Sequence, residues 1–237
     1  MRHYHLLAAG IAAALILPLV GCDDDDPMQP QPDPAMVRIV NAAEGTTNIE
    51  VEHTGSGSAV ATLDFRETTT TCVQVPAGTR TFTFESGDTE IASATAELEE
   101  GDRYLLVLAS PGAGDERRAV IASDEHVVGA GNNGLRLVNA TATAGDVYVT
   151  TPTGTPGAAF RVSGNLGPLA LGNFQFGDLL QRATEHTRVR LFDVDATTEA
   201  RADVTLTGLP GSRIATVVFT DDGAEAEDRA FLVFPCP

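Results

Sequence analysis

The sequence contains neither tryptophan nor lysine, and aromatic residues make up only 5% of its 237 residues. A hydrophobic core must therefore come mainly from Val, Leu, Ile, Ala and Phe, and an apolar content of 43% is enough for one. Every basic residue is arginine, and 15 of them stand against 33 acidic residues, for a formal net charge of −18. Such a field repels phosphate backbones, so nucleic acid is not an expected partner. The simplest interpretation is an acidic surface that keeps the protein soluble.

The common catalytic and zinc-binding motifs are also missing. The G-x-S-x-G motif of serine hydrolases is absent, and Ser56 lies in a Gly-Ser repeat, residues 55–58, that predicts a hairpin loop. Outside the first 21 residues, His53, His126 and His186 have no partner two or four positions away, so we expect solvated histidines and no zinc site. The sequence therefore predicts no enzyme.

Three other short motifs resemble ligand sites but have simpler interpretations. Gly129-x-Gly131-x-x-Gly134 matches the dinucleotide fingerprint, yet it leads directly into a strand and opens no helix, which indicates a linker. Asp23–Asp26 lacks the spaced ligands of a calcium loop and predicts a solvated tether. Asp221-Asp222-Gly223 predicts a turn, with calcium binding as the weaker alternative. No cofactor or metal is expected.

The first 21 residues predict a lipoprotein signal peptide. Arg2 precedes an apolar stretch, Leu6–Leu17, whose twelve residues are too few to span a bilayer comfortably. The sequence Leu19-Val20-Gly21-Cys22 then resembles the bacterial lipobox. That resemblance implies cleavage before Cys22 and acylation of this cysteine, which would hold the protein on the inner or outer membrane of a bacterial envelope. The alternative is an ordinary signal peptide with a chance cysteine. Residues 22–35 would form an acidic, proline-rich tether.

One strand pattern occurs twice, 98 positions apart. Val37–Ala42 reads VRIVNA and Leu135–Ala140 reads LRLVNA. A second alternating run follows each copy, at Asn48–Val51 and at Asp146–Val149. This spacing is too long for a solenoid repeat and favours two consecutive β-domains, residues 36–125 and 135–237, joined by a glycine-rich linker at 126–134.

The first of these domains contains short alternating runs separated by turn residues. The expected strands are Val37–Ala42, Ile49–His53, Val60–Phe65, Cys72–Val75, Arg80–Glu85, Ile91–Leu98, Tyr104–Ala109 and Ala119–Ser123. This pattern is typical of an immunoglobulin-like sandwich, and no sustained period of 3.6 residues supports helices. We therefore expect an all-β protein with two tandem immunoglobulin-like antiparallel β-sandwiches.

Several of these segments resemble a bacterial family called domain of unknown function 4397. The resemblance lies in Val37–Ala42, Leu63-Asp64-Phe65, the Val-Pro-Ala-Gly turn at 75–78 and Gly101-Asp102-Arg103-Tyr104. It implies a secreted or cell-envelope protein, often with tandem domains, and no established activity. Glu44 departs from the proline that the family often has after its first strand, which concerns the first turn and not the fold.

The second domain is the more diverged copy. Its later segments align at a larger offset, and the extra residues fall in a Gly/Pro/Thr-rich insertion, Thr151–Leu171. We expect this insertion to be a long loop, either a binding surface or tolerated drift. In the repeated strand, Arg38 and Arg136 occupy outward positions with their charged ends in water, and Asn41 and Asn139 close the following turns.

Two cysteines remain besides Cys22. Cys72 and Cys236 occupy non-equivalent points of the repeat, so a disulfide in an oxidising envelope would tie the first domain to the C-terminal tail. The alternative is two unrelated thiols.

These features predict a membrane-anchored envelope lipoprotein that acts as a non-catalytic binding or adhesion module. The expected partners are the lipid bilayer, through acylated Cys22, and a glycan, peptidoglycan or another envelope protein. The alternative function is a structural spacer within an envelope complex.

Overall fold

Alternating apolar residues form β-strands throughout the described part of the chain, where the helical element is one 3₁₀ turn, η1 (Ala158–Phe160). The computed structural model describes residues 32–110, 116–124, 134–151, 153–170, 175–176, 187–206, 214–221 and 229–237. The predicted signal peptide with Cys22, most of the predicted tether, the linker residues 126–133, His126 and His186 lie outside these ranges. No helix within them is long and apolar enough to cross a membrane.

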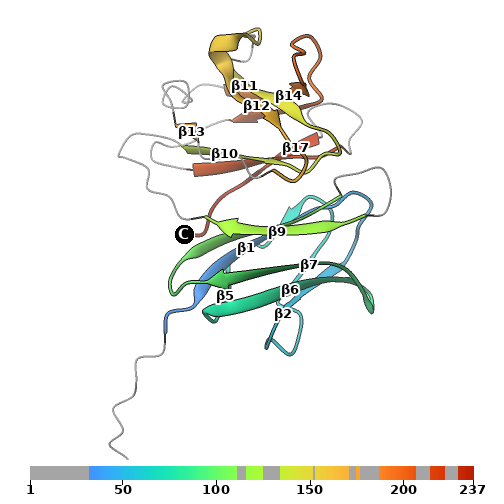
Figure 1. Ribbon diagram of the computed structural model, residues 1–237, viewed down its shortest axis with the longest axis vertical. Helices are drawn as coiled ribbons and strands as arrows, with labels where there is room; N and C mark the ends of the chain where they lie inside the picture. The colour runs from blue at the N-terminus through green and yellow to red at the C-terminus, as the bar shows by residue number, and fades with distance from the viewer. Residues whose placement is uncertain are drawn as a thin grey trace, which may run out of the picture. The chain divides into compact units, whose positions relative to one another are not determined.

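The first half of the chain forms two sheets that enclose one core (Figure 1). One sheet has the order β4 (Glu67–Thr68), β1 (Ala35–Ala42), β8 (Arg103–Ala109) and β9 (Arg118–Ser123), and β5 (Val73–Val75) also pairs with β1. The other has the order β3 (Ala61–Leu63), β2 (Ile49–His53), β6 (Gly78–Ser86) and β7 (Thr89–Leu98). Alternation directs Val37 and Ile39 of one sheet toward Phe82 and Phe84 of the other, and all four are fully buried.

The second half repeats this strand order with its own core. One sheet runs β13 (Gln175–Phe176), β10 (Gly134–Asn139), β16 (Ile214–Phe219) and β17 (Ala230–Val233). The other runs β12 (Arg161–Leu166), β11 (Gly145–Thr150), β14 (Thr187–Asp193) and β15 (Ala202–Leu206). Thus β10, β11, β12, β14, β15, β16 and β17 occupy the places of β1, β2, β3, β6, β7, β8 and β9.

The eight strands predicted between residues 36 and 125 are all present, with ends displaced by at most two residues. The prediction of purely antiparallel sheets needs one correction. β1 pairs with β8 in parallel, with Val37 opposite Tyr104, and β10 pairs with β16 in parallel, with Leu135 opposite Ala215. In each half the chain passes through the second sheet and returns in its original direction, so the first strand and the next-to-last strand run the same way.

The predicted loop Thr151–Leu171 also needs correction, because it contains an edge strand. β12 pairs with β11 with irregular register and occupies the place that β3 has in the first half. Glycine, proline and threonine suggested a loop, yet an edge strand tolerates such residues because it satisfies hydrogen bonds on one side only.

A third apolar cluster joins the outer faces of the two sheets that contain the repeated strand. It includes Val40 and Val107 from the first half and Val138, Val218 and Val233 from the second. Strands β1, β8, β10 and β16 are therefore buried on both faces over most of their length.

The two repeated arginines lie on these covered faces. Arg38 and Arg136 point away from their own cores, as alternation predicts, but they retain only 8% and 7% of their exposure. The expectation that their charged ends reach water is wrong, because the period of a strand tells which face a residue occupies and not what covers that face.

Candidate binding groove

A groove with a volume of about 500 Å³ runs between the edges of the two sheets in the first half. One wall is formed by residues 60–63, around β3, and the other by residues 67–73, from β4 to the start of β5. Between these walls the chain turns at Arg66, whose φ is 65° and whose backbone N–H donates to the carbonyl of Asn41 at 2.7 Å. This turn carries the chain from one sheet to the other and leaves the two edges apart.

The groove has an apolar floor and a hydroxyl-rich rim. Val60, Ala61, Leu63 and Val73 pack against the core below it. Threonine hydroxyls surround the floor, and the most exposed threonines are Thr62, Thr70 and Thr71. The one charged lining residue is Glu67, whose carboxylate accepts the Asp64 N–H at 2.9 Å. Aromatic rings, histidines and cations are absent from this lining, all of which the structure describes.

A buried asparagine fixes the end of β1 next to this groove. Asn41 is fully buried, and its side-chain amide donates to the Leu63 carbonyl at 3.3 Å and to Thr46 at 2.9 Å. Its side-chain oxygen accepts the Ala43 N–H at 3.0 Å. The predicted turn-closing role is therefore confirmed, and the same side chain also ties β1 to the edge strand β3.

The second half repeats this arrangement of hydrogen bonds around Asn139, and we call each of the two arrangements an asparagine bracket. Asn139 donates to the Leu166 carbonyl at 2.7 Å and to the Thr143 carbonyl at 3.0 Å, and it accepts the Thr141 N–H at 3.1 Å. The turn after β12 is equivalent as well, since Leu169 has a φ of 53° and its N–H donates to the Asn139 carbonyl at 2.7 Å.

Comparison with protein families gives one match. Residues 35–150 match the family described as Domain of unknown function (DUF4397). The segment similar to DUF4397 therefore includes the first half and extends into β10 and β11 of the second. The match, slightly less than half the chain, begins at β1, includes both walls of the groove and ends with β11. No match was found among curated proteins.

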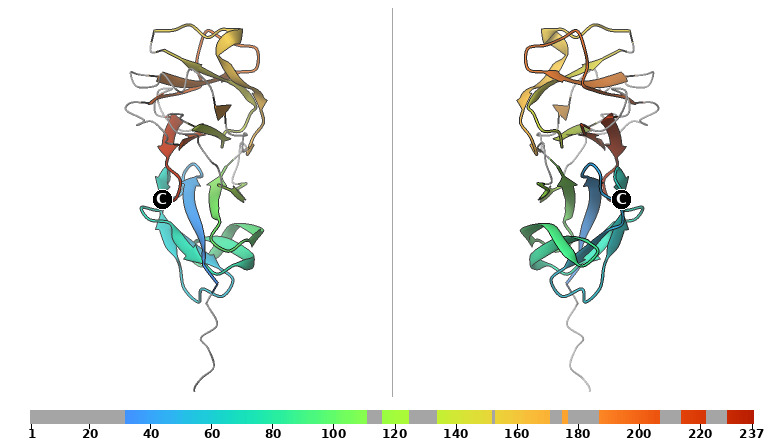
Figure 2. Two further views of the ribbon diagram at one scale, coloured as in Figure 1. Left: turned by 90° about the vertical axis from the view of Figure 1, so that its left-hand side faces the viewer. Right: turned by 90° about the vertical axis from the view of Figure 1, so that its right-hand side faces the viewer.

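The C-terminal tail returns to the first half beside the groove. The sulfur atoms of Cys72, in the groove wall, and Cys236 are joined in a disulfide with a Cα–Cα distance of 5.8 Å. Two arginines hold the tail by its carbonyls, Arg38 at Pro235 (3.4 Å) and Arg103 at Pro237 (3.1 Å). The C-terminus accordingly lies beside β1, drawn in blue in Figure 2.

Charged side chains are buried where the first half meets the second half. Arg136 pairs with Asp124 at 2.9 Å and also donates to the Ser123 carbonyl at 2.6 Å. Arg38 donates to the Thr69 carbonyl in the groove wall. Burial lowers the pKa of both arginines, and the charge of Asp124 acts in the opposite direction. Sequence reasoning missed Asp124. The available signal was the arginine that both copies of the repeated strand contain, because arginine pairs with carboxylates.

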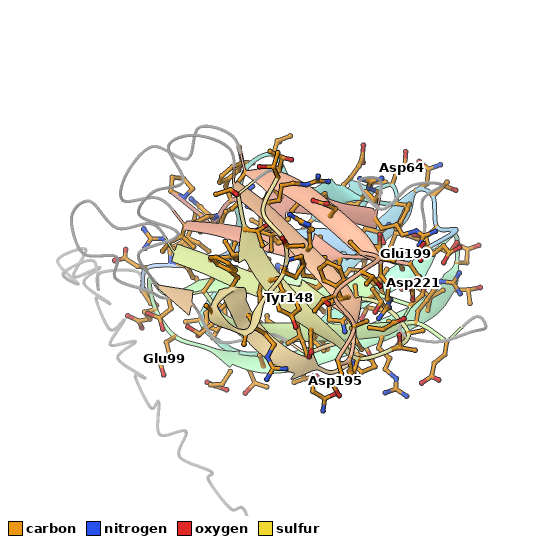
Figure 3. All side chains as sticks on the ribbon, turned by 90° about the horizontal axis from the view of Figure 1, so that it is seen from above. Asp64, Glu99, Tyr148, Asp195, Glu199 and Asp221 are labelled. Atoms are coloured by element: carbon orange, nitrogen blue, oxygen red, sulfur yellow. A yellow bond between two sulfur atoms is a disulfide. The ribbon has the colours of Figure 1, made fainter. Side chains whose placement is uncertain are left out.

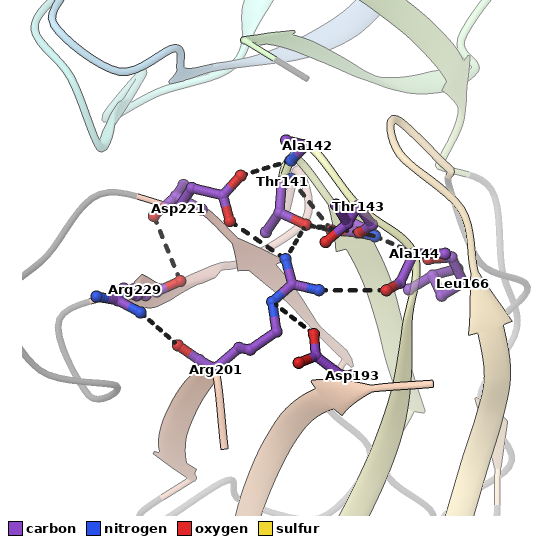
Figure 4. Close-up of polar contacts among 11 residues, drawn as sticks. Thr141, Ala142, Thr143, Ala144, Leu166, Asp193, Arg201, Asp221 and Arg229 are labelled. Carbon is purple, nitrogen blue, oxygen red and sulfur yellow. Dashed lines mark hydrogen bonds and ion pairs between the residues drawn. The ribbon is translucent and has the colours of Figure 1, made fainter. Parts of the chain in front are cut away.

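Asp221, the first residue of the predicted Asp-Asp-Gly turn, is part of a polar network in the second half (Figure 4), and Asp222 and Gly223 lie outside the described residues. Asp221 accepts the Ala142 N–H at 2.5 Å, and Arg201 reaches its other oxygen at 3.2 Å. The same guanidinium donates to Thr141 at 2.8 Å and to the Ala144 carbonyl at 3.2 Å. Protein donors thus engage both carboxylate oxygens of Asp221, and the network links the segment after β10, the residue before β15 and the end of β16.

Exposed carboxylates occur at several places on the described surface. Exposed carboxylates such as Glu99, Asp195 and Glu199 occupy different sides of the view in Figure 3. The described residues contain no group of three potential metal ligands.

His53 and Ser56, which were also singled out from the sequence, lie outside the groove lining. The ring of His53 contacts Phe82 edge to face, with 5.9 Å between ring centroids. The backbone N–H of His53 donates to the hydroxyl of Ser56 at 3.3 Å, within the predicted hairpin. Sequence reasoning missed the groove itself. The available signal was a run of four threonines, Thr68–Thr71, between two strands.

Proposed function

We propose that the protein is a non-catalytic binding module of the bacterial envelope, held on the membrane by acylated Cys22. In this proposal both halves are immunoglobulin-like sandwiches in tandem, and the second is a diverged copy of the DUF4397 domain. The repeated strand order, the parallel strand pair in each half and the matching Asn41 and Asn139 brackets support a duplication.

The observation that carries the proposal is the groove between β3 and the β4–β5 wall. An apolar floor below a hydroxyl rim can take a ligand without any rearrangement of the strands. The groove also lies inside the part of the chain that matches the family, and the resemblance to this family implies a secreted or cell-envelope protein.

Site-specific crosslinking in intact bacteria tests the proposal. A photoactivatable residue would replace exposed Thr70 at the rim, and a matched control would replace Glu90, exposed on β7 outside the groove lining. We expect Thr70, and not Glu90, to capture a discrete protein or glycan, read by mass spectrometry. Equal capture from both positions, or capture from neither, would contradict a binding function at this groove.

The membrane anchor has a separate test. Metabolic labelling with an acyl-chain probe should mark the wild-type protein, and Cys22→Ser should remove both the label and the membrane association. A label that survives the substitution would refute the anchor and leave the groove proposal standing.

The extensive contacts between the halves favour a second candidate function, a structural spacer. A buried apolar cluster, a buried ion pair and a disulfide all span the junction. Under this alternative, Thr62→Arg in the groove would leave the envelope phenotype of the wild type intact, whereas a binding module would lose ligand capture and show the phenotype of a deletion.

A further inference from the structure

We infer that the groove binds an extended peptide that places a lysine or arginine side chain beside Glu67. The inference rests on the proposed binding function and specifies the class of its ligand.

The walls of the groove are strand edges, which bind extended peptides. β3 is the terminal strand of its sheet and pairs with β2, while β4 and β5 pair with β1 at the edge of the opposite sheet. An edge strand presents backbone donors and acceptors to which another chain can add as a further strand. The three residues of β3 match three or four ligand residues, since a strand rises about 3.3 Å per residue.

The floor determines which side chains the ligand can present. Alternate residues of an extended peptide would point down toward Ala61, Leu63 and Val73, where small apolar side chains find contact. The lining offers no aromatic ring on which a sugar or a base could stack, and no cation to hold a phosphate or carboxylate. These features favour a peptide over a glycan or an anionic ligand.

The charge distribution determines the sign of the ligand. Glu67 is exposed at the rim, and the protein as a whole carries a net charge of −18. A cationic side chain would gain attraction both from Glu67 and from the surrounding field, which also raises the rate of encounter. An acidic peptide of the same shape would be repelled.

Fluorescence anisotropy with defined peptides tests this inference on the full purified chain. The probe is a fluorescein-labelled pentapeptide that alternates valine and lysine, compared with a matched peptide that alternates valine and glutamate. We expect the lysine peptide to bind and the glutamate peptide to bind at least tenfold more weakly. We also expect Glu67→Gln to weaken the lysine peptide about two- to fivefold, the range for an exposed ion pair, and Glu90→Gln to leave it unchanged.

A third peptide tests the binding mode. N-methylation of alternate amides keeps the side chains and the charge but removes the backbone donors that a strand needs, so this peptide should lose binding. Thr62→Arg, which adds bulk and positive charge at the rim, should also abolish binding, and Thr62→Ser should retain it. Equal binding of the methylated peptide would overturn strand addition, and equal binding of the lysine and glutamate peptides would overturn the charge assignment.

The in-cell crosslinking separates this inference from the proposed function. A glycan captured through Thr70, with no binding of any peptide, would overturn the peptide inference while the binding function stands. Failure of both experiments would overturn both.

Discussion

At the residue scale, the most consequential side chains are two arginines at equivalent positions of the repeated strand. Arg38 and Arg136 are buried between the two halves, and both feel the charge of Asp124, which is itself only 2% exposed. A buried charge that loses its partner is strongly destabilising, because its desolvation is no longer compensated. Asp124, directly after β9, therefore pairs with Arg136, and its charge also favours the charged form of Arg38.

We expect Asp124→Asn to lower the free energy of unfolding by about 3–5 kcal/mol, the range for removing one partner of a buried ion pair. Urea denaturation followed by circular dichroism measures the change. The matched control is Glu116→Gln, which breaks the exposed pair between Glu116 and Arg118 and should cost less than about 1 kcal/mol. Equal losses in the two variants would show that Asp124 is not the counter-charge of the arginines.

Asp146 gives a prediction about pH. Burial alone would raise the pKa of this carboxyl. The carboxylate, however, accepts backbone N–H groups of Asn165 (2.7 Å) and Asp195 (3.1 Å) and pairs with the guanidinium of Arg161 (3.2 Å). These interactions outweigh burial and lower the pKa below the ordinary 3.8. A lowered pKa in the folded state means that the ionised group stabilises the fold at neutral pH. That contribution is lost as the pH falls through the folded-state value.

Asp146→Asn should therefore destabilise the protein by about 1–3 kcal/mol at neutral pH. The side-chain NH₂ of the new asparagine would face backbone N–H groups that need an acceptor. The difference from wild type should shrink as the pH falls below about 4, where the unfolded aspartate takes up its proton. The midpoints of urea denaturation of both proteins, recorded from neutral pH to below about pH 4, measure this difference. Asp88→Asn, in the exposed turn between β6 and β7, should show no such difference, and a gap for Asp146→Asn that stays constant with pH would refute the assignment.

At the scale of elements, the periodicity of apolar residues was sufficient to locate the strands of the first half but not to predict which strands pair with one another. Strict alternation in β6 and apolar runs in β1 and β8 located those strands correctly. The parallel pairing of β1 with β8 depends on contacts between residues more than 60 positions apart, such as Val37 and Tyr104, and no local pattern encodes it.

The groove could not be predicted for a similar reason. Its walls, residues 60–63 and 67–73, are close in sequence, yet the space between them exists because the chain changes sheets at Arg66. A positive φ at an arginine leaves no compositional trace of the kind that glycine gives. The four threonines, Thr68–Thr71, mark the segment without revealing that it faces a cavity.

The asparagine brackets give a prediction at the element scale. Asn41 and Asn139 connect the ends of β1 and β10 to the following turns and to the edge strands β3 and β12. Asn41→Ala and Asn139→Ala should each lower the free energy of unfolding by about 1–3 kcal/mol, because buried backbone groups lose their partners. Chemical denaturation measures this, with Glu50→Ala on the exposed face of β2 as control. A loss for one asparagine and none for the other would show that the two brackets are not equivalent.

At the scale of the whole molecule, the two halves behave as one structure. Residues Pro32–Pro237 form a single compact unit, and an apolar cluster with residues such as Val40 and Val138 joins the two cores. The disulfide from Cys72 to Cys236 then secures the tail across a separation of 164 residues. The two halves are therefore not independent domains, because the outer faces of β1 and β10 carry apolar residues such as Val40 and Val138 that pack in one shared cluster.

This junction gives the last prediction. The oxidised protein should unfold in one calorimetric transition, because neither half can leave the other without exposing the shared cluster. Reduction should lower the free energy of unfolding by about 5 kcal/mol, the chain-entropy estimate for a loop of 164 residues, and the transition should remain single.

Disruption of the shared cluster should separate the halves where reduction alone does not. Val138→Asp buries a carboxylate in that cluster, so the reduced variant should unfold in two transitions, one for each half. Thr205→Asp, at an exposed position of β15, adds the same charge and should keep one transition. Two transitions in the reduced wild type would show that the disulfide alone couples the halves, and one transition in reduced Val138→Asp would locate the coupling outside this cluster.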